Sequence, residues 1–238
     1  MIDVHTHILP NIDDGARSIE NTISMLQEAK QAGFTDILFT PHYMENTYEN
    51  DINEITKRVE VVEEATKRYG ININLHFGNE VYLTPDIHKK IINGQVQTLN
   101  KSQYVLVELP MHTKILYAEF EFERLIEKGF IPIMAHPERY SYVQDNIKYL
   151  EPFYKRGVLL QCNYASLIGH YGAEAKKTIK KLLKMDVVTF MASDVHRPQS
   201  IYTNMDKILK KLQKYTTEEQ FERITEINAK KYLLNKFC

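Results

Sequence analysis

The sequence predicts an α/β fold in which helices cover a parallel β-sheet, and two observations indicate this class. Short apolar runs alternate with amphipathic stretches along the whole chain of 238 residues, which is typical of repeated strand–helix units. Seven such units follow one another without a linker, an internal repeat or a low-complexity tract. We therefore expect one domain over residues 1–238. An open doubly wound sheet and a closed barrel both fit this order.

Seven apolar runs are expected to form strands, because each is short and ends at turn or chain-breaking residues. The second run stops at Pro41, the fourth at Pro110 and the fifth just before Pro137. In chain order, the expected strands cover residues 2–5, 36–40, 71–77, 104–109, 131–135, 158–162 and 187–192.

Amphipathic periodicity predicts the helices between these strands. In the first, at 18–32, Ile19, Ile23 and Leu26 are spaced three or four residues apart, and Gly33 follows as an expected stop. The same pattern predicts helices at 49–69, 86–92, 115–128, 146–156 and 173–185, and two or three helices within 202–237.

The composition excludes several classes of protein. Thirty basic and 31 acidic residues give a net charge of −1, which argues against bulk nucleic-acid binding. Two cysteines, Cys162 and Cys238, are too few for a disulfide framework or a zinc knuckle. No apolar run approaches the ~18 residues of a membrane span, and the chain starts directly in a strand without a signal-peptide pattern. We therefore expect a cytoplasmic protein that does not insert into a membrane.

Six of the seven predicted strands end in residues that can bind metal. The functional end of such folds is where parallel strands finish, and residues two apart on a strand point to the same side. The sixth strand ends in Asn163, a poor ligand. A closed barrel would gather these strand ends into one ring, so we favour a distorted seven-stranded barrel. The residues concerned are His5, His7, His42, Glu80, Glu108, His136, Asp194 and His196.

These groups, with either Asp13 or Asp14 from the first loop, make nine potential ligands, more than one tetrahedral or octahedral ion can hold. Two or three ions bridged by a carboxylate fit the number better. A mixed nitrogen and oxygen set suits manganese, iron or zinc more than magnesium or calcium. Glu108 interrupts an apolar run, where an unpaired carboxylate is costly. It either binds a cation or points to solvent from an edge strand.

Arginines follow three of these motifs. Arg139 and Arg197 stand close after His136 and His196, and a guanidinium matches the geometry of a phosphate. We expect both to contact a phosphate. The alternative is that each pairs with a neighbouring acid, and for Arg17 both interpretations stay open.

Five motifs carry a specific resemblance. They are H-x-H-x-x-P-x-x-D-D-G at 5–15, T-P-H at 40–42, G-x-E at 78–80, H-P-E-R at 136–139 and S-D-x-H at 193–196. With them the chain resembles the polymerase and histidinol phosphatase (PHP) superfamily. Within that superfamily it looks like the bacterial manganese-dependent protein-tyrosine phosphatases of capsule and exopolysaccharide operons.

The resemblance implies a distorted (β/α)7 barrel with three metal ions. His5, His7, Glu80 and Asp194 would hold one ion. Glu80, Glu108 and His136 would hold a second, with Glu80 bridging, and Asp14, His42 and His196 would hold the third. The implied substrate is the tyrosine-rich tail of a membrane-associated bacterial tyrosine kinase that regulates polysaccharide synthesis.

This chemistry needs no cysteine. Metal ions lower the pKa of bound water, so that hydroxide can attack phosphorus, and the ions with the two arginines neutralise phosphoryl charge. The Cys-x5-Arg loop of thiol phosphatases is absent, because Ile168 stands six residues after Cys162. We expect Cys162 to be a buried strand residue.

The sequence is also compatible with two other functions. A phosphatase of a small ester such as histidinol phosphate would share the barrel and the ligands. A non-catalytic regulator that binds the kinase tail is disfavoured, because a binding module does not need nine ligands. A run of lysines in the helix at 173–185 is expected to be a solvated face; it comprises Lys176, Lys177, Lys180, Lys181 and Lys184.

Overall fold

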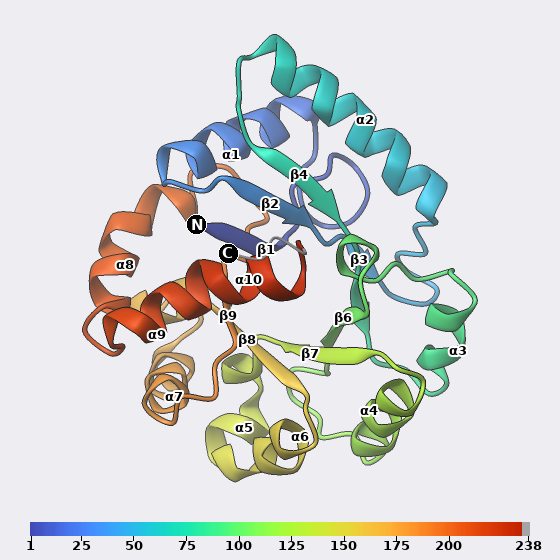
Figure 1. Cartoon of the computed structure of the whole chain (residues 1–238), viewed down its shortest axis with the longest axis vertical. Helices are drawn as coiled ribbons and strands as arrows, with labels where there is room; N and C mark the ends of the chain where they lie inside the picture. The colour runs from blue at the N-terminus through green and yellow to red at the C-terminus, as the bar shows by residue number, and fades with distance from the viewer. Residues whose placement is uncertain (235–238) are drawn as a thin grey trace.

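The computed structural model describes residues 1–234, and its strands form a ring enclosed by helices (Figure 1). One parallel sheet contains β1 (Ile2–Thr6), β2 (Asp36–Phe39) and β4 (Asn74–Phe77). The other is also parallel, in the order β3 (His42–Tyr43), β5 (Glu80–Tyr82), β6 (Tyr104–Glu108), β7 (Ile131–Ala135), β8 (Leu159–Asn163) and β9 (Phe190–Ala192).

The two sheets continue into each other. β3 follows β2 after Thr40 and Pro41, and β5 follows β4 after Gly78 and Asn79, so each pair is one interrupted strand. On the other side β9 lies against β1, where Asp194 N donates to His5 O at 2.9 Å. A parallel bridge between Thr6 and Val195 extends this contact. The described residues thus form seven strand positions in a ring, in agreement with the predicted α/β class.

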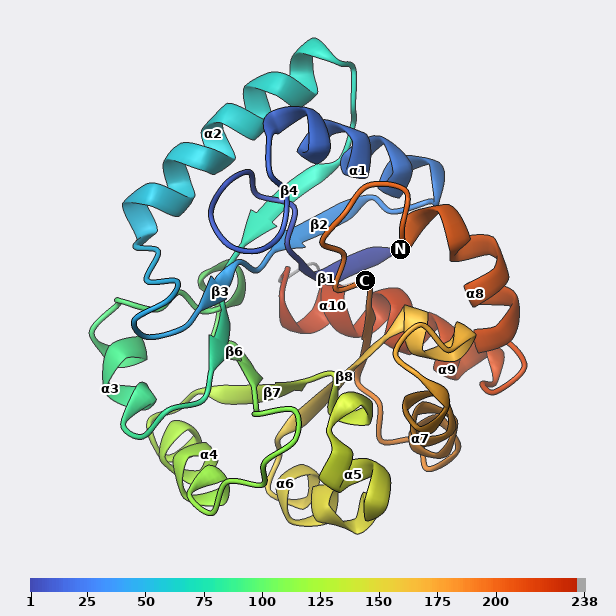
Figure 2. The ribbon, with the colours of Figure 1, turned by 180° about the vertical axis from the view of Figure 1, so that it is seen from behind.

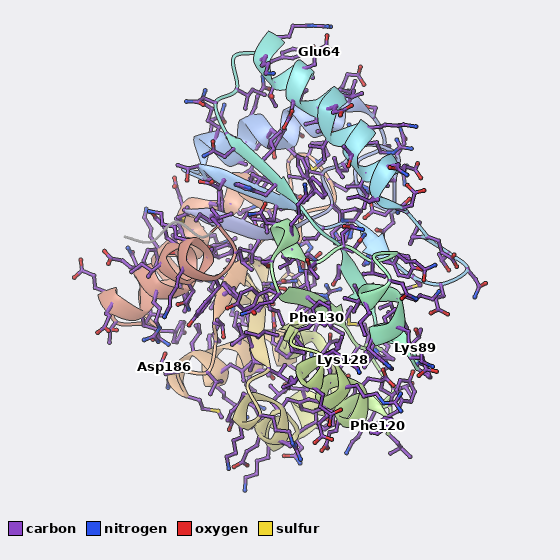
Figure 3. All side chains as sticks on the ribbon, turned by 45° about the vertical axis from the view of Figure 1, so that its right-hand side comes forward. Glu64, Lys89, Phe120, Lys128, Phe130 and Asp186 are labelled. Atoms are coloured by element: carbon purple, nitrogen blue, oxygen red, sulfur yellow. The ribbon has the colours of Figure 1, made fainter. Side chains whose placement is uncertain are left out.

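All helices before α10 lie outside the ring, and Figure 3 shows the labelled side chains Glu64, Lys89 and Phe120 of three of them at the edge of the molecule. The side chains of Ser18 and Asp51 cap α1 and α2 by accepting the backbone N–H three residues on. The helices are α1 (Ile19–Gln31), α2 (Ile52–Arg68), α3 (Ile87–Ile92), α4 (Ala118–Glu127), α5 (Ser141–Asp145), α6 (Glu151–Lys155), α7 (Ala173–Lys184), α8 (Met205–Leu212), α9 (Glu218–Glu222) and α10 (Asn228–Tyr232).

The helix predicted at 146–156 is present, although its first part is a 3-10 turn (Ile147–Leu150) that continues into α6. The preceding helix α5 was not predicted. Asn146 has an extended backbone (φ −142°, ψ 95°) between α5 and the 3-10 turn, and Pro152 stands at the start of α6, where a missing N–H costs nothing. Smaller differences are that α2 begins at Ile52 rather than 49, and that β4 begins at Asn74 rather than 71.

The last helices close the amino end of the ring. α9 continues through a π-helical turn (Arg223–Ile227) into α10, which crosses the ring in front of β1 (Figure 1). Ala229 and Leu233 pack there with Val4, Leu106 and Phe190 from the interior of the ring. This leaves the carboxyl end of the strands as the open end. The predicted helical region extends to Phe237, which lies outside the described residues.

Within residues 1–234, no helix combines the length and apolar character that crossing a membrane requires.

Candidate metal centre

The predicted ligands meet at the carboxyl end of the ring. Figure 2 shows this side, with the loop after β1 and the loop after β9 in front of the strands. Short distances link all of them, and Glu80 on β5 lies in the middle. The group consists of His5, His7, Asp14, His42, Glu80, Glu108, His136, Asp194 and His196.

The first part of the group surrounds the end of β1. His5 Nε2 and His7 Nε2 lie 3.1 Å apart, and Glu80 Oε2 lies 3.1 and 3.2 Å from them. Asp194 Oδ1 is 3.5 Å from both nitrogens. All four side chains are buried. Alternation along β1 explains the pair of imidazoles, because His5 and His7 project on the same side.

The second part lies between β5, β6 and β7. His136 Nε2 is 3.0 Å from Glu80 Oε1 and 3.7 Å from Glu108 Oε1. Glu108 is only 8% exposed, and β6 has β5 and β7 as neighbours. The alternative in which Glu108 points to solvent from an edge strand is therefore wrong.

The third part is more open. Asp14 Oδ1 lies 3.6 Å from His42 Nε2 and 3.4 Å from His196 Nε2. Asp13 has a different place, since its buried carboxylate accepts hydrogen bonds from His7 Nδ1 at 2.7 Å and from His42 N at 3.1 Å. The structure thus places Asp14 among the candidate ligands and Asp13 behind His7.

Local backbone geometry aims these side chains. His136 (φ 31°) and Asp194 (φ 54°) have left-handed backbone conformations, which are uncommon for non-glycine residues. Gly15 allows the loop after β1 to approach His7 closely, since a Cβ at its position would lie 2.0 Å from His7 O. The loop can pass this close to His7 only because residue 15 has no side chain.

The electrostatics of the cluster favour cations. Burial alone would lower the pKa of His5, but the charges of Glu80 and Asp194 raise it to about 9. Burial and the charge of Glu80 raise the pKa of Glu108. Burial, reinforced by the positive charge of Arg139, lowers the pKa of His136 to about 4, so that this imidazole stays neutral. The carboxylates thus concentrate negative charge beside imidazole nitrogens, and this combination is suited to metal ions.

Buried polar atoms without partners provide a test of that fit. His42 Nδ1 and Glu80 Oε2 are 3.0 Å apart, yet they do not have hydrogen-bond geometry and neither makes a hydrogen bond within residues 1–234. Buried polar atoms normally have partners. Atoms that converge without hydrogen-bonding are expected where several ligands point at a shared ion. The nitrogen and oxygen donors present therefore fit divalent metal ions of the manganese, iron or zinc type.

The two predicted phosphate-binding arginines line one pocket beside the centre. Its volume is about 290 Å³, and Tyr171, Asp194 and His196 also line it. Arg139 Nη1 donates to Asp194 Oδ2 at 2.6 Å, and its guanidinium lies 4.3 Å from the centre of the Tyr171 ring. Arg139 thus pairs with an acid, but with Asp194 rather than its sequence neighbour Glu138.

Arg197 has no acidic partner within the described residues. Its Nη1 donates to the backbone carbonyls of Asp14, Gly15 and His196 and so joins the loops after β1 and β9. Arg17, for which two interpretations were open, is exposed.

Sequence reasoning missed several residues around the centre. Tyr48 stacks on His42 at 6.0 Å between ring centres, and Gln161 and Asn163 of β8 hydrogen-bond to candidate ligands. A signal was present for the last two, since two amides stand at the end of the strand that lacks a ligand. The prediction that Cys162 is buried is confirmed; Cys238 lies outside the described residues.

A family model described as "Capsular polysaccharide synthesis, CpsB/CapC" matches residues 1–234. The Staphylococcus aureus protein CapC is 34% identical over 212 residues, which is 89% of this chain and 82% of that protein. The tyrosine-protein phosphatase YwqE of Bacillus subtilis is 30% identical over 236 residues, 99% of this chain and 92% of that protein.

Solved structures are similar to this chain as well. The structure described as YwqE from Bacillus subtilis and CpsB from Streptococcus pneumoniae, metal-dependent tyrosine phosphatases, superposes with a TM-score of 0.91 and 28% identity. It covers 100% of this chain and 96% of the other. Histidinol phosphate phosphatase from Lactococcus lactis has a TM-score of 0.59 at 12% identity, covering 90% of this chain and 94% of that one. The second likeness concerns the fold alone.

Proposed function

This chain belongs to the CpsB/CapC family of capsular polysaccharide synthesis, and we propose on that basis that it is a metal-dependent protein-tyrosine phosphatase. The observation that carries the proposal is the gathering of five imidazoles and three further carboxylates around Glu80, next to a pocket lined by two arginines. A phosphate monoester is an anionic substrate that suits this combination of charges.

The candidate ligands divide among the three groups described above. His5, His7, Glu80 and Asp194 would hold one ion, Glu80, Glu108 and His136 another, and Asp14, His42 and His196 a third. When bound, divalent ions lower the pKa of water toward neutrality and offset phosphoryl charge. This division rests on distances between donor atoms and on the likeness to metal-dependent phosphatases.

The protein's own residues bind and orient the phosphate. Arg139 uses one N–H group on Asp194, which leaves its other guanidinium donors for phosphoryl oxygens. Arg197 is anchored through Nη1 to three backbone carbonyls, so that its remaining donors are available at the pocket wall. Both charges offset the negative charge of the transition state. The leaving phenolate of tyrosine has a parent pKa near ~10, so it departs without strong acid catalysis.

Three finer points belong to the same proposal. We propose manganese as the working metal, with iron or zinc as alternatives that the same donors accept. We propose a phosphotyrosine protein as substrate, namely the tail of a membrane-associated bacterial tyrosine kinase that regulates polysaccharide synthesis. We also propose that the reaction takes place in the cytoplasm, where such a tail would be phosphorylated.

One assay tests the function. Metal-free protein is incubated with a phosphotyrosyl peptide, with and without manganese, and released phosphate is measured beside the metal content of the protein. Turnover that requires manganese supports the proposal, and turnover that survives complete removal of metal refutes it. Histidinol phosphate is assayed in parallel, since dominant activity on that ester would replace the proposed substrate by a small molecule.

A further inference from the structure

β8 supplies no candidate ligand, yet two of its side chains face the metal centre. Gln161 and Asn163 are two residues apart, so they project on the same side of the strand. Both are completely buried. Cys162 between them faces the other way, into the apolar layer under the helices.

The two amides form a continuous chain of hydrogen bonds between two candidate ligands. His5 Nδ1 lies 2.8 Å from Gln161 Oε1. Gln161 Nε2 donates to Asn163 Oδ1 at 2.8 Å, and Asn163 Nδ2 donates to Asp194 Oδ2 at 2.8 Å. We call this chain, His5–Gln161–Asn163–Asp194, the amide relay.

The direction of the relay is set by the carboxylate at its end. Asp194 also accepts from Arg139 at 2.6 Å and can only accept, so Asn163 must turn its NH2 group toward it. The carbonyl oxygen of Asn163 then faces Gln161, whose own NH2 group fills that contact. Gln161 is left with its oxygen toward His5, and an oxygen accepts only from a protonated Nδ1.

Hydrogen bonds elsewhere hold Asn163 in place. Its backbone N–H donates to Glu138 Oε1 at 2.8 Å, and the same carboxyl oxygen accepts from Ser166 Oγ at 2.6 Å. Glu138 is completely buried. These bonds anchor the backbone of Asn163 in the interior, and turning its amide around would bring an oxygen against the carboxylate of Asp194.

We propose that Gln161 and Asn163 are positioning residues that keep the proton of His5 on Nδ1. The Nε2 lone pair then faces the point at which His7 Nε2, Glu80 Oε2 and Asp194 Oδ1 converge. The same relay orients Asp194, so one pair of amides aligns two ligands for one ion. This inference rests on the proposed metal centre. Hydrogen bonds of this kind behind a metal ligand typically change metal affinity about 10- to 100-fold.

The test compares three variants of the full chain. Gln161→Leu removes both the oxygen and the NH2 group of the side-chain amide, whereas Gln161→Glu keeps an oxygen that can accept a hydrogen bond from His5. Gln220→Leu is the matched control, because Gln220 is also buried and donates two hydrogen bonds, to Leu183 O and Asp186 Oδ1, away from the centre. Manganese dissociation constants are measured by competition with a chelator. Histidine ring protons are observed by 15N NMR in zinc-loaded protein, with His5 assigned by its loss in His5→Gln.

We expect a slowly exchanging proton on His5 Nδ1 in the wild type and in Gln161→Glu. In Gln161→Leu this proton should exchange rapidly, and manganese affinity should fall about 10- to 100-fold, while Gln220→Leu keeps wild-type affinity. A His5 protonated on Nε2, or wild-type affinity in Gln161→Leu, overturns the inference. If Gln161→Leu does not fold, loss of the slow proton in Gln161→Glu overturns it as well. Metal binding with the expected proton but without phosphotyrosine turnover would refute the proposed function and leave the relay intact.

Discussion

Replacing Arg139 by alanine tests whether this side chain serves the substrate or only its acidic partner. The structure gives it both roles, through the 2.6 Å bond to Asp194 and its place in the pocket wall. Loss of a donor that offsets transition-state charge costs about 10²- to 10³-fold in kcat, or ~2.7–4 kcal/mol. Loss of a charge-assisted hydrogen bond alone costs about 1.5–3 kcal/mol of stability, and this loss by itself does not lower kcat.

We therefore expect Arg139→Ala to lower kcat/KM for p-nitrophenyl phosphate about 10²- to 10³-fold at saturating manganese. Its bound metal, measured by elemental analysis, should stay near the wild-type level. Arg139→Lys keeps the charge without the planar fork and should be intermediate. Arg156→Ala is the control, because Arg156 pairs with Glu119 and Glu123 on the outer surface. Unchanged kinetics in Arg139→Ala would show that the arginine only neutralises Asp194.

Four further outcomes are expected. His136→Ala should abolish turnover while circular dichroism stays that of the folded protein; an active variant would exclude a ligand role. Cys162→Ser should keep its activity, and complete loss of activity in a folded serine variant would reopen a thiol mechanism. N-ethylmaleimide at pH 8 should not inactivate the wild type, because burial raises the pKa of the Cys162 thiol well above its usual value. Removing metal with a chelator should lower the melting temperature in calorimetry, because ligand at 100 times its Kd stabilises by ~2.7 kcal/mol; an unchanged melting temperature contradicts tight binding. Gly15→Ala should cost about 1–3 kcal/mol in urea unfolding through its clash with His7 O and should weaken metal binding; wild-type values for both would contradict the close approach.

The strands were predictable because each buried strand of a parallel sheet is a short apolar run, as in Ile131–Ala135, where prediction and structure agree. The stop at Pro41, which lacks an N–H for the ladder, was also predictable, but not that the strand resumes as β3. At Gly78 a Cβ would lie 2.8 Å from Leu99 Cα, a contact made only on folding. The short helix α5 was missed, because the sequence pattern does not show the extended backbone at Asn146 that separates α5 from the predicted helical turns after it.

The candidate site divides in a similar way. Strand ends identify side chains that meet in a parallel fold, so eight of the nine residues could be chosen before their distances were known. Asp13 and Asp14 are alike in sequence, and only the fold sends one behind His7 and the other toward His196. Gln161 was missed because an amide is not a metal ligand, and its partner His5 lies far away along the chain.

The contact between β1 and β9 sets how much of the chain must fold before the proposed ion site at His5 is complete. His5 and Asp194 lie at opposite ends of the order of strands, so they meet only when the ring closes. A chain that stops before β9 lacks Asp194 and His196, so two of the three proposed groups would be incomplete, whereas Glu80, Glu108 and His136 would all be present. Filling the other two groups would therefore depend on the last strand of the ring.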